Sequence, residues 1–151
     1  YAISYSIMGA AAFAAIILLS RAGFEAENIA DFRGLWKSNP LHALLILFIM
    51  ASLAGVPPFL GFWAKLVVIG AALDAGMTWL AILAVVCAVV GAFYYLRIIR
   101  AMFFEDAEGD GATIHPDSHL RAVFAINALA LLVLGIFGDP LFHWCQAAFA
   151  A

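Results

Sequence analysis

Lys65 is the residue whose chemistry stands out, because it is the one charged side chain between Lys37 and Asp74 and is surrounded by apolar residues. If this segment crosses a bilayer, an ammonium near its centre costs about 2.5–3.5 kcal/mol on insertion scales. Sequences seldom keep such a cost without a use. Desolvation disfavours the charged form of the amine, so we expect Lys65 to take up and release protons as a relay.

Two consecutive prolines, Pro57 and Pro58, precede Lys65 and should break the helix that carries it. Proline lacks a backbone N–H and clashes with the preceding turn, so the carbonyls of Leu53 and Ala54 lose their usual donors. Open backbone of this kind is tolerated at membrane depth only where it is buried in protein or lines a wet cavity. Broken helices with an ionisable group beside the gap mark ion sites in transporters.

The geometry of the break should bring the lysine back to it. In a helix that starts near Pro58, Gly61 and Lys65 lie on the same face, and side chains tilt toward the helix N-terminus. The ammonium therefore points at the break, which we expect to consist of Gly55, Pro57, Pro58 and Gly61. A second interpretation ends the crossing near Ala64, with Lys65 reaching the membrane interface as a snorkelling side chain and residues 66–73 on the surface.

The elements that carry these residues are apolar over membrane-spanning lengths. Hydrophobic residues make up 67% of the 151 residues and charged residues 11%, whereas a soluble domain is about half apolar and a quarter charged. Long apolar segments cover residues 1–20, 41–73, 78–104 and 120–150, and a bilayer core about 30 Å thick needs about 20 residues. The sequence predicts an all-α, polytopic transmembrane helix bundle. It excludes a soluble enzyme, a nucleic-acid binder and a disulfide scaffold.

The charges of the connections decide how often the segment 41–73 crosses. It would make a helix about 50 Å long, so it crosses either twice or once as two half-helices broken near 55–58. Connections 21–40 and 97–121 each hold three basic residues, and the turn after Asp74 holds none. A single crossing places both basic connections on the cytoplasmic side, as the positive-inside rule requires. We therefore expect four crossings, one of them discontinuous.

Other polar residues are weaker candidates. Asn127 lies within the last apolar segment, where a hydrogen bond between helices is the simpler role and a place in the proton path the alternative. His42 and His143 lie near segment ends, as interfacial imidazoles often do. The connection after residue 104 is rich in acidic and histidine side chains, namely Glu105, Asp106, Glu108, Asp110, His115 and His119. Its glycines and proline favour a solvated loop, and we expect no metal site.

Three strings together carry a family resemblance. They are Asp31-Phe-Arg-Gly-Leu35, Leu53-Ala-Gly-Val-Pro-Pro-Phe-Leu-Gly-Phe-Trp-Ala-Lys65 and Tyr94-Tyr-Leu-Arg-Ile98. In this order they resemble the C-terminal third of the subunit N family of NADH-quinone oxidoreductase, antiporter-like membrane subunits of respiratory complex I. The chain starts at Tyr1 inside an apolar run, so we expect it to be the C-terminal piece of a longer protein.

The resemblance implies a fold and a function. Subunit N has fourteen membrane helices in two inverted five-helix repeats, of which residues 1–151 would supply the last four helices. Lys65 matches the family's lysine on the discontinuous helix, where subunit M typically has glutamate. The implied role is proton translocation, with NADH, FMN, iron–sulfur clusters and quinone bound by other subunits and no cofactor in this chain.

The same resemblance implies the surroundings. The partners would be the lipid bilayer, the antiporter-like subunit M and the small subunits K and J, with no nucleic acid. The location would be the bacterial inner (plasma) membrane. Two alternatives remain open, a subunit of a multisubunit Na+/H+ antiporter and a purely structural membrane spacer.

Overall fold

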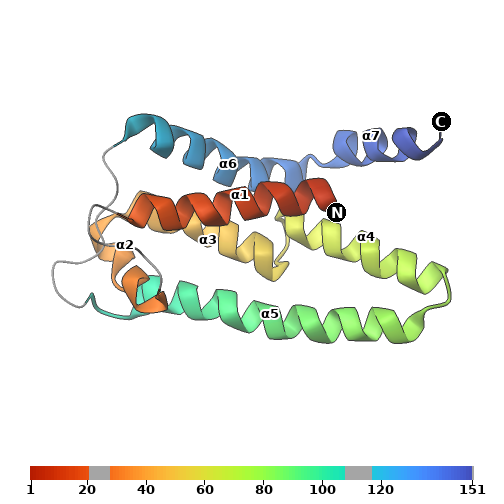
Figure 1. Cartoon of the computed structure of the whole chain (residues 1–151), viewed down its shortest axis with the longest axis horizontal. Helices are drawn as coiled ribbons and strands as arrows, with labels where there is room; N and C mark the ends of the chain where they lie inside the picture. Colours follow the sequence, from red (N-terminus) through yellow and green to blue (C-terminus); the bar gives the residue numbers. More distant parts are fainter. Residues whose placement is uncertain (21–27, 108–116, 151) are drawn as a thin grey trace.

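The computed structural model describes residues 1–20, 28–107 and 117–150, and every regular element in these ranges is helical (Figure 1). In chain order the elements are α1 (Ala2–Leu19), the 3-10 helix η1 (Ile29–Phe32), α2 (Leu35–Ser38), α3 (Pro40–Ala54), α4 (Leu60–Asp74), α5 (Thr78–Phe104), α6 (Ser118–Ile136) and α7 (Asp139–Ala150). Helices α1, α5 and α6 are each long and apolar enough to cross a membrane. The expected all-α class is confirmed over the described residues, and it is consistent with a membrane helix bundle.

The segment 41–73 forms two helices that follow one another in the same direction (Figure 1). Helix α3 begins at Pro40, whose fixed φ suits a first helical position, and ends where Gly55 adopts a φ of 87°. Helix α4 begins at Leu60. Each helix has 15 residues, or about 22 Å, so neither alone matches a bilayer core of about 30 Å.

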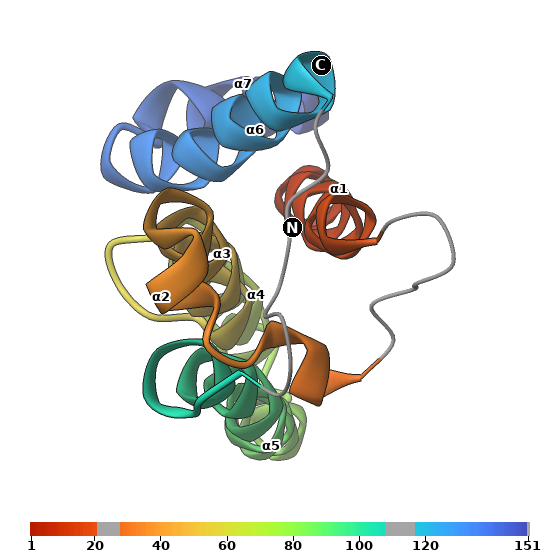
Figure 2. The same ribbon diagram turned by 90° about the vertical axis from the view of Figure 1, so that its left-hand side faces the viewer.

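Helix α3 lies at the centre of the packing and contacts α1, α4, α5 and α6. The end-on view of Figure 2 shows it between α6 and α5 with α1 alongside. The core is made by fully buried aliphatic and aromatic side chains, among them Leu18, Ile46, Ile49, Phe124 and Leu131. The last turn of α3 is buried at Ser52 and Leu53, whereas Gly55 is half-buried and Val56, Pro57 and Pro58 are exposed.

The expected last helix over residues 120–150 is divided in the structure. Helix α6 ends at Ile136 and α7 starts at Asp139, so one predicted helix is corrected to two. The reason is the sequence Gly138-Asp139-Pro140. Proline cannot donate the backbone bond that would continue a helix, but it fits the first turn of a new one, and aspartate is favoured just before it.

The short elements η1 and α2 lie against the C-terminal end of α5. Gly34 between them has a φ of 67°, and its N–H donates to the carbonyl of Ala101 at 3.3 Å. A Cβ on Gly34 would lie 2.8 Å from the backbone nitrogen of Ala107. The close approach of the two segments therefore depends on glycine at this position.

Charged residues join the same two segments. Glu105 accepts from Arg33 Nε at 2.9 Å and pairs with Arg100 Nε at 3.4 Å. Lys37 pairs with the exposed Asp106, and the hydrogen bond from Lys37 lowers the pKa of the Asp106 carboxyl. These five charged residues gather at one end of the bundle.

Candidate functional site

The ammonium group of Lys65 lies at the break between α3 and α4. Its Nζ donates to the carbonyl of Leu53 at 2.7 Å and to the carbonyl of Ala54 at 3.0 Å. In an uninterrupted helix these carbonyls would accept from residues 57 and 58, which are prolines and have no N–H. The lysine therefore supplies the two donors that the prolines cannot.

The electrostatics of the break also favour a cation at this point. The last carbonyls of α3 carry the negative end of its helix dipole, which attracts positive charge. Gly55 leaves the space, since a Cβ there would lie 3.1 Å from both Cδ and Nζ of Lys65 and the backbone φ of 87° is itself strained for other residues. The glycine that ends α3 is thus also the residue that admits the lysine.

A buried serine joins the two half-helices beside the lysine, and the sequence analysis missed it. Ser52 in the last turn of α3 is 0% exposed. Its Oγ accepts from the N–H of Gly61 at 3.1 Å and donates to Met8 Sδ of α1 at 3.2 Å. A Cβ on Gly61 would lie 1.9 Å from the Ser52 carbonyl oxygen. A serine in an apolar helix has no local signal for this role, because its partner lies nine residues further on, beyond the break.

Helix α6 closes the other side of the break. A Cβ on Gly135 would lie 2.1 Å from the carbonyl oxygen of Pro58 and 2.7 Å from the nitrogen of Leu60. The backbones of α6 and of the link between α3 and α4 are therefore in direct contact. Of the four residues expected to make the break, Gly55 contacts the lysine, Gly61 contacts Ser52 and Pro58 contacts α6.

Lys65 faces two cavities between α4 and α5. One has a volume of about 350 Å³, and its polar lining residues besides Lys65 are Tyr1, Tyr5, Cys87 and Tyr95. The other has a volume of about 220 Å³ and is lined by Gly55 and by apolar residues of α4 and α5. Both volumes exceed that of a water molecule, about 30 Å³. Water in the larger cavity would have a charged nitrogen and phenol oxygens as partners.

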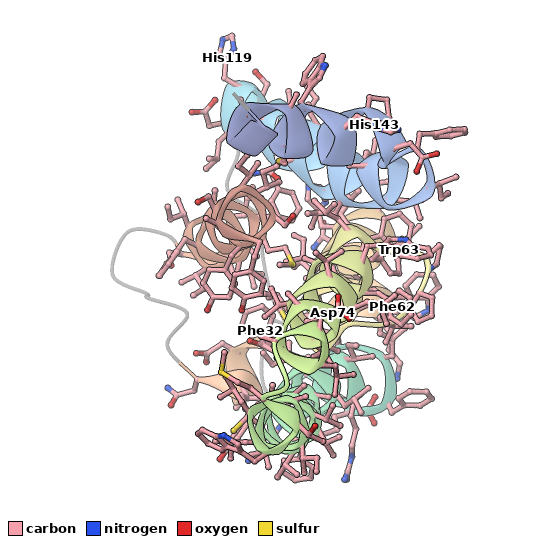
Figure 3. The ribbon with its side chains drawn as sticks, turned by 90° about the vertical axis from the view of Figure 1, so that its right-hand side faces the viewer. Phe32, Phe62, Trp63, Asp74, His119 and His143 are labelled. Carbon is pink, nitrogen blue, oxygen red and sulfur yellow. The ribbon has the colours of Figure 1, made fainter. Side chains whose placement is uncertain are left out.

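The remaining sequence candidates lie elsewhere. His42 is buried at the start of α3. Asn127 has a buried Oδ1 that makes no hydrogen bond to any described residue. Figure 3 shows His143 of α7 and His119 of α6 on the outer side of the molecule, away from Phe62 and Trp63 of α4. Membership of His42, His143 or Asn127 in a proton path stays a prediction.

The structure describes the acidic connection up to residue 107 and again from residue 117. Glu108, Asp110 and His115 lie outside the described residues. Within the ranges that are described, no three His, Cys, Asp or Glu residues lie together as a metal site requires. Glu105 and Asp106 are engaged with basic side chains instead.

Comparison with known proteins identifies the family of this chain. Residues 1–91 match the family model described as NADH:quinone oxidoreductase/Mrp antiporter, TM. The chain belongs to this family. The matched residues include α3, the break, all of α4 and the first half of α5, so the family region contains Ser52, the break and Lys65, while Tyr95 and Gly135 lie beyond it.

Individual members of the family are similar over the full length of the chain. The NADH-quinone oxidoreductase subunit N of Xanthomonas euvesicatoria is 57% identical over 99% of the chain and 31% of its own length. The subunit N of Alkalilimnicola ehrlichii is 49% identical over 99% of the chain and 30% of its own length. The chain thus spans about a third of these curated relatives and corresponds to their C-terminal part, as the sequence analysis predicts.

A solved structure shows the same arrangement. A chain of respiratory complex I from Thermus thermophilus with bound aureothin superposes with a TM-score of 0.76 over 90% of this chain and 31% of that chain, at 31% identity. The predicted resemblance to antiporter-like subunit N is therefore confirmed in sequence and in fold.

Proposed function

We propose that the chain is part of a proton-translocating membrane subunit of NADH:quinone oxidoreductase, in which α3 and α4 together make one discontinuous crossing and Lys65 carries protons. The observation that supports this most is the pair of bonds from Lys65 Nζ to the carbonyls of Leu53 and Ala54. A lysine that snorkelled to an interface would direct its nitrogen away from the membrane. Here the nitrogen is directed toward the break, onto two backbone carbonyls whose usual N–H donors are replaced by prolines.

A relay mechanism follows from this position. In the protonated state all three N–H groups of Lys65 are available, and two of them satisfy the carbonyls of α3. Transfer of the third proton to water in the larger cavity leaves a neutral amine that still has donors for the same carbonyls. The backbone therefore keeps its partners in both protonation states. Burial disfavours the charge and the carbonyl pair favours it, so neither state is locked.

The remainder of the assembly completes the proposed activity. NADH, FMN, iron–sulfur clusters and quinone would be bound by other subunits, with subunits M, K and J as the membrane partners. The bacterial inner membrane would hold the complex, with connections 21–40 and 97–121 on the cytoplasmic side. The gathering of Arg33, Lys37 and Arg100 at one end of the bundle supports this orientation.

Lys65→Met in the full subunit, within the intact complex, tests the proposal. We expect NADH-driven proton uptake into inverted membrane vesicles to fall about tenfold or more at normal complex assembly, which corresponds to about 1.4 kcal/mol or more in the barrier. Lys37→Met is the matched control, because Lys37 is an exposed lysine of α2, and the complex with this variant should pump normally. Undiminished pumping by an assembled Lys65→Met complex would refute the relay and favour the structural spacer.

The second candidate is a subunit of a multisubunit Na+/H+ antiporter, because the matching family description also names the Mrp antiporter. The two candidates differ in their associated proteins. Purification of the native protein with flavin and iron–sulfur subunits supports the oxidoreductase. Purification without them, together with Na+-driven proton exchange in vesicles, supports the antiporter.

A further inference from the structure

The serine at the end of α3 makes a bond that neither half-helix could make alone. The first N–H groups of any α-helix have no partner within the helix, and Phe59, the N-cap residue of α4, provides no side-chain cap. The N–H of Gly61, the second residue of α4, is instead accepted by Ser52 Oγ at 3.1 Å. Ser52 is 0% exposed, so this hydrogen bond is sheltered from bulk solvent.

The same turn of α3 also holds the next turn of α4. Leu53, adjacent to Ser52, accepts from Lys65 Nζ at 2.7 Å, and Lys65 lies one helical turn after Gly61. The two bonds attach consecutive turns of α4 to consecutive residues of α3. One of them carries the charge, while the other is independent of whether Lys65 is protonated.

We propose that Ser52 is a positioning residue for Lys65, an inference that rests on the proposed proton relay. By capping Gly61, the hydroxyl fixes the first turn of α4 so that the lysine nitrogen stays within reach of the Leu53 and Ala54 carbonyls when its proton leaves. The tight contact at Gly61, where a Cβ would lie 1.9 Å from the Ser52 carbonyl oxygen, sets the distance at which this cap can form.

The hydrogen bond that the Ser52 hydroxyl donates explains why its oxygen can accept from Gly61. Ser52 Oγ donates to Met8 Sδ at 3.2 Å, and a thioether is a weak acceptor. The donation fixes the direction of the hydroxyl, so its lone pairs remain free for Gly61. Helix α1 thereby orients the cap through Met8, which is itself buried.

The test compares Ser52→Thr with Ser52→Val in the intact complex. The two variants have nearly the same shape and add the same bulk, but only threonine keeps a hydroxyl. We expect Ser52→Val to pump about tenfold less than Ser52→Thr. An unpaired buried N–H at Gly61 lowers the population of the conformation in which Lys65 Nζ contacts the Leu53 and Ala54 carbonyls by about that factor. In a Lys65→Met background the two variants should pump equally, since Ser52 acts through the lysine. Ser52→Ala, which adds no bulk, provides the same comparison with the wild type if the larger side chains prevent assembly.

Electron cryomicroscopy of the assembled variants provides a readout that does not depend on pumping. In Ser52→Val, Lys65 Nζ should leave the carbonyls of Leu53 and Ala54, whereas in Ser52→Thr it should keep both contacts. Where Ser52→Ala is used instead, the same difference is expected between Ser52→Ala and the wild type. Equal pumping and unchanged contacts in the variant without the hydroxyl would overturn the positioning role. A displaced lysine together with normal pumping by Lys65→Met would instead uphold the positioning role and refute the proposed relay.

Discussion

Gly135 offers a direct test of whether the backbone contact between α6 and the helix break holds the bundle together. In Gly135→Ala the new Cβ would lie 2.1 Å from the carbonyl oxygen of Pro58 and 2.7 Å from the backbone of Phe59 and Leu60. Ordinary contact begins near 3.4 Å, so the two backbones must separate by about 1 Å, which a close-packed interior resists. Since overpacking costs about 1–3 kcal/mol and backbone is less compliant than a side chain, we expect a loss of about 3 kcal/mol.

Thermal unfolding of the purified full-length subunit in its complex measures this loss. One kcal/mol corresponds to about 2–4 °C for a unit of 150–250 residues, so a loss of about 3 kcal/mol lowers the melting temperature by about 6–12 °C in a unit of that size and by less in the longer full-length subunit. Gly70→Ala is the control, because a Cβ at Gly70 of α4 meets nothing within 4 Å in the described structure. Alanine improves helix propensity by up to about 1 kcal/mol, so the control should be unchanged or slightly stabilised. Equal melting temperatures for the two variants would refute the close contact.

Two further predictions concern the ends of the helices. Lys37→Met should raise the pKa of Asp106 toward its ordinary value, because the pairing with Lys37 lowers it. The small stabilisation from the pair is present at neutral pH and is lost as the pH falls through the lowered pKa, so the melting temperatures of variant and wild type should converge in acid. A difference in melting temperature that grew in acid would contradict the pairing. Gly34→Ala should lower the melting temperature more than Gly76→Ala does. Both glycines have a positive φ (67° and 74°), but only at Gly34 would a Cβ lie 2.8 Å from the backbone of Ala107. Equal melting temperatures for the two variants would refute the close packing of η1 and α2 against the end of α5.

The sequence was informative where the signal is local. The two missing N–H groups of Pro57 and Pro58 identify which carbonyls are left open, and the tilt of side chains along a helix directs Lys65 toward them. The structure places the ammonium on those two carbonyls. Proton transfer by that nitrogen stays a prediction.

The sequence was uninformative where the signal depends on a partner distant along the chain. Ser52 resembles any small residue of an apolar helix until Gly61 is placed against it. Gly135 resembles any glycine of a membrane helix until it is seen against Pro58. Hydrophobic periodicity reports which residues avoid water, but not which backbones approach one another. The division of the last predicted helix is different, since Asp139-Pro140 is a local start signal that its apolar surroundings conceal.

The seating of Gly135 on the Pro58 carbonyl has a mechanical consequence. A discontinuous helix is often pictured as a free hinge, with one half swinging about the gap. Here no such swing is open to α4 alone, since α6 is wedged against the joint with no space for even a methyl group. The start of α4 is therefore fixed on two sides, by the contact of Pro58 and Leu60 with Gly135 of α6 and by the hydrogen bond of Gly61 to Ser52 of α3.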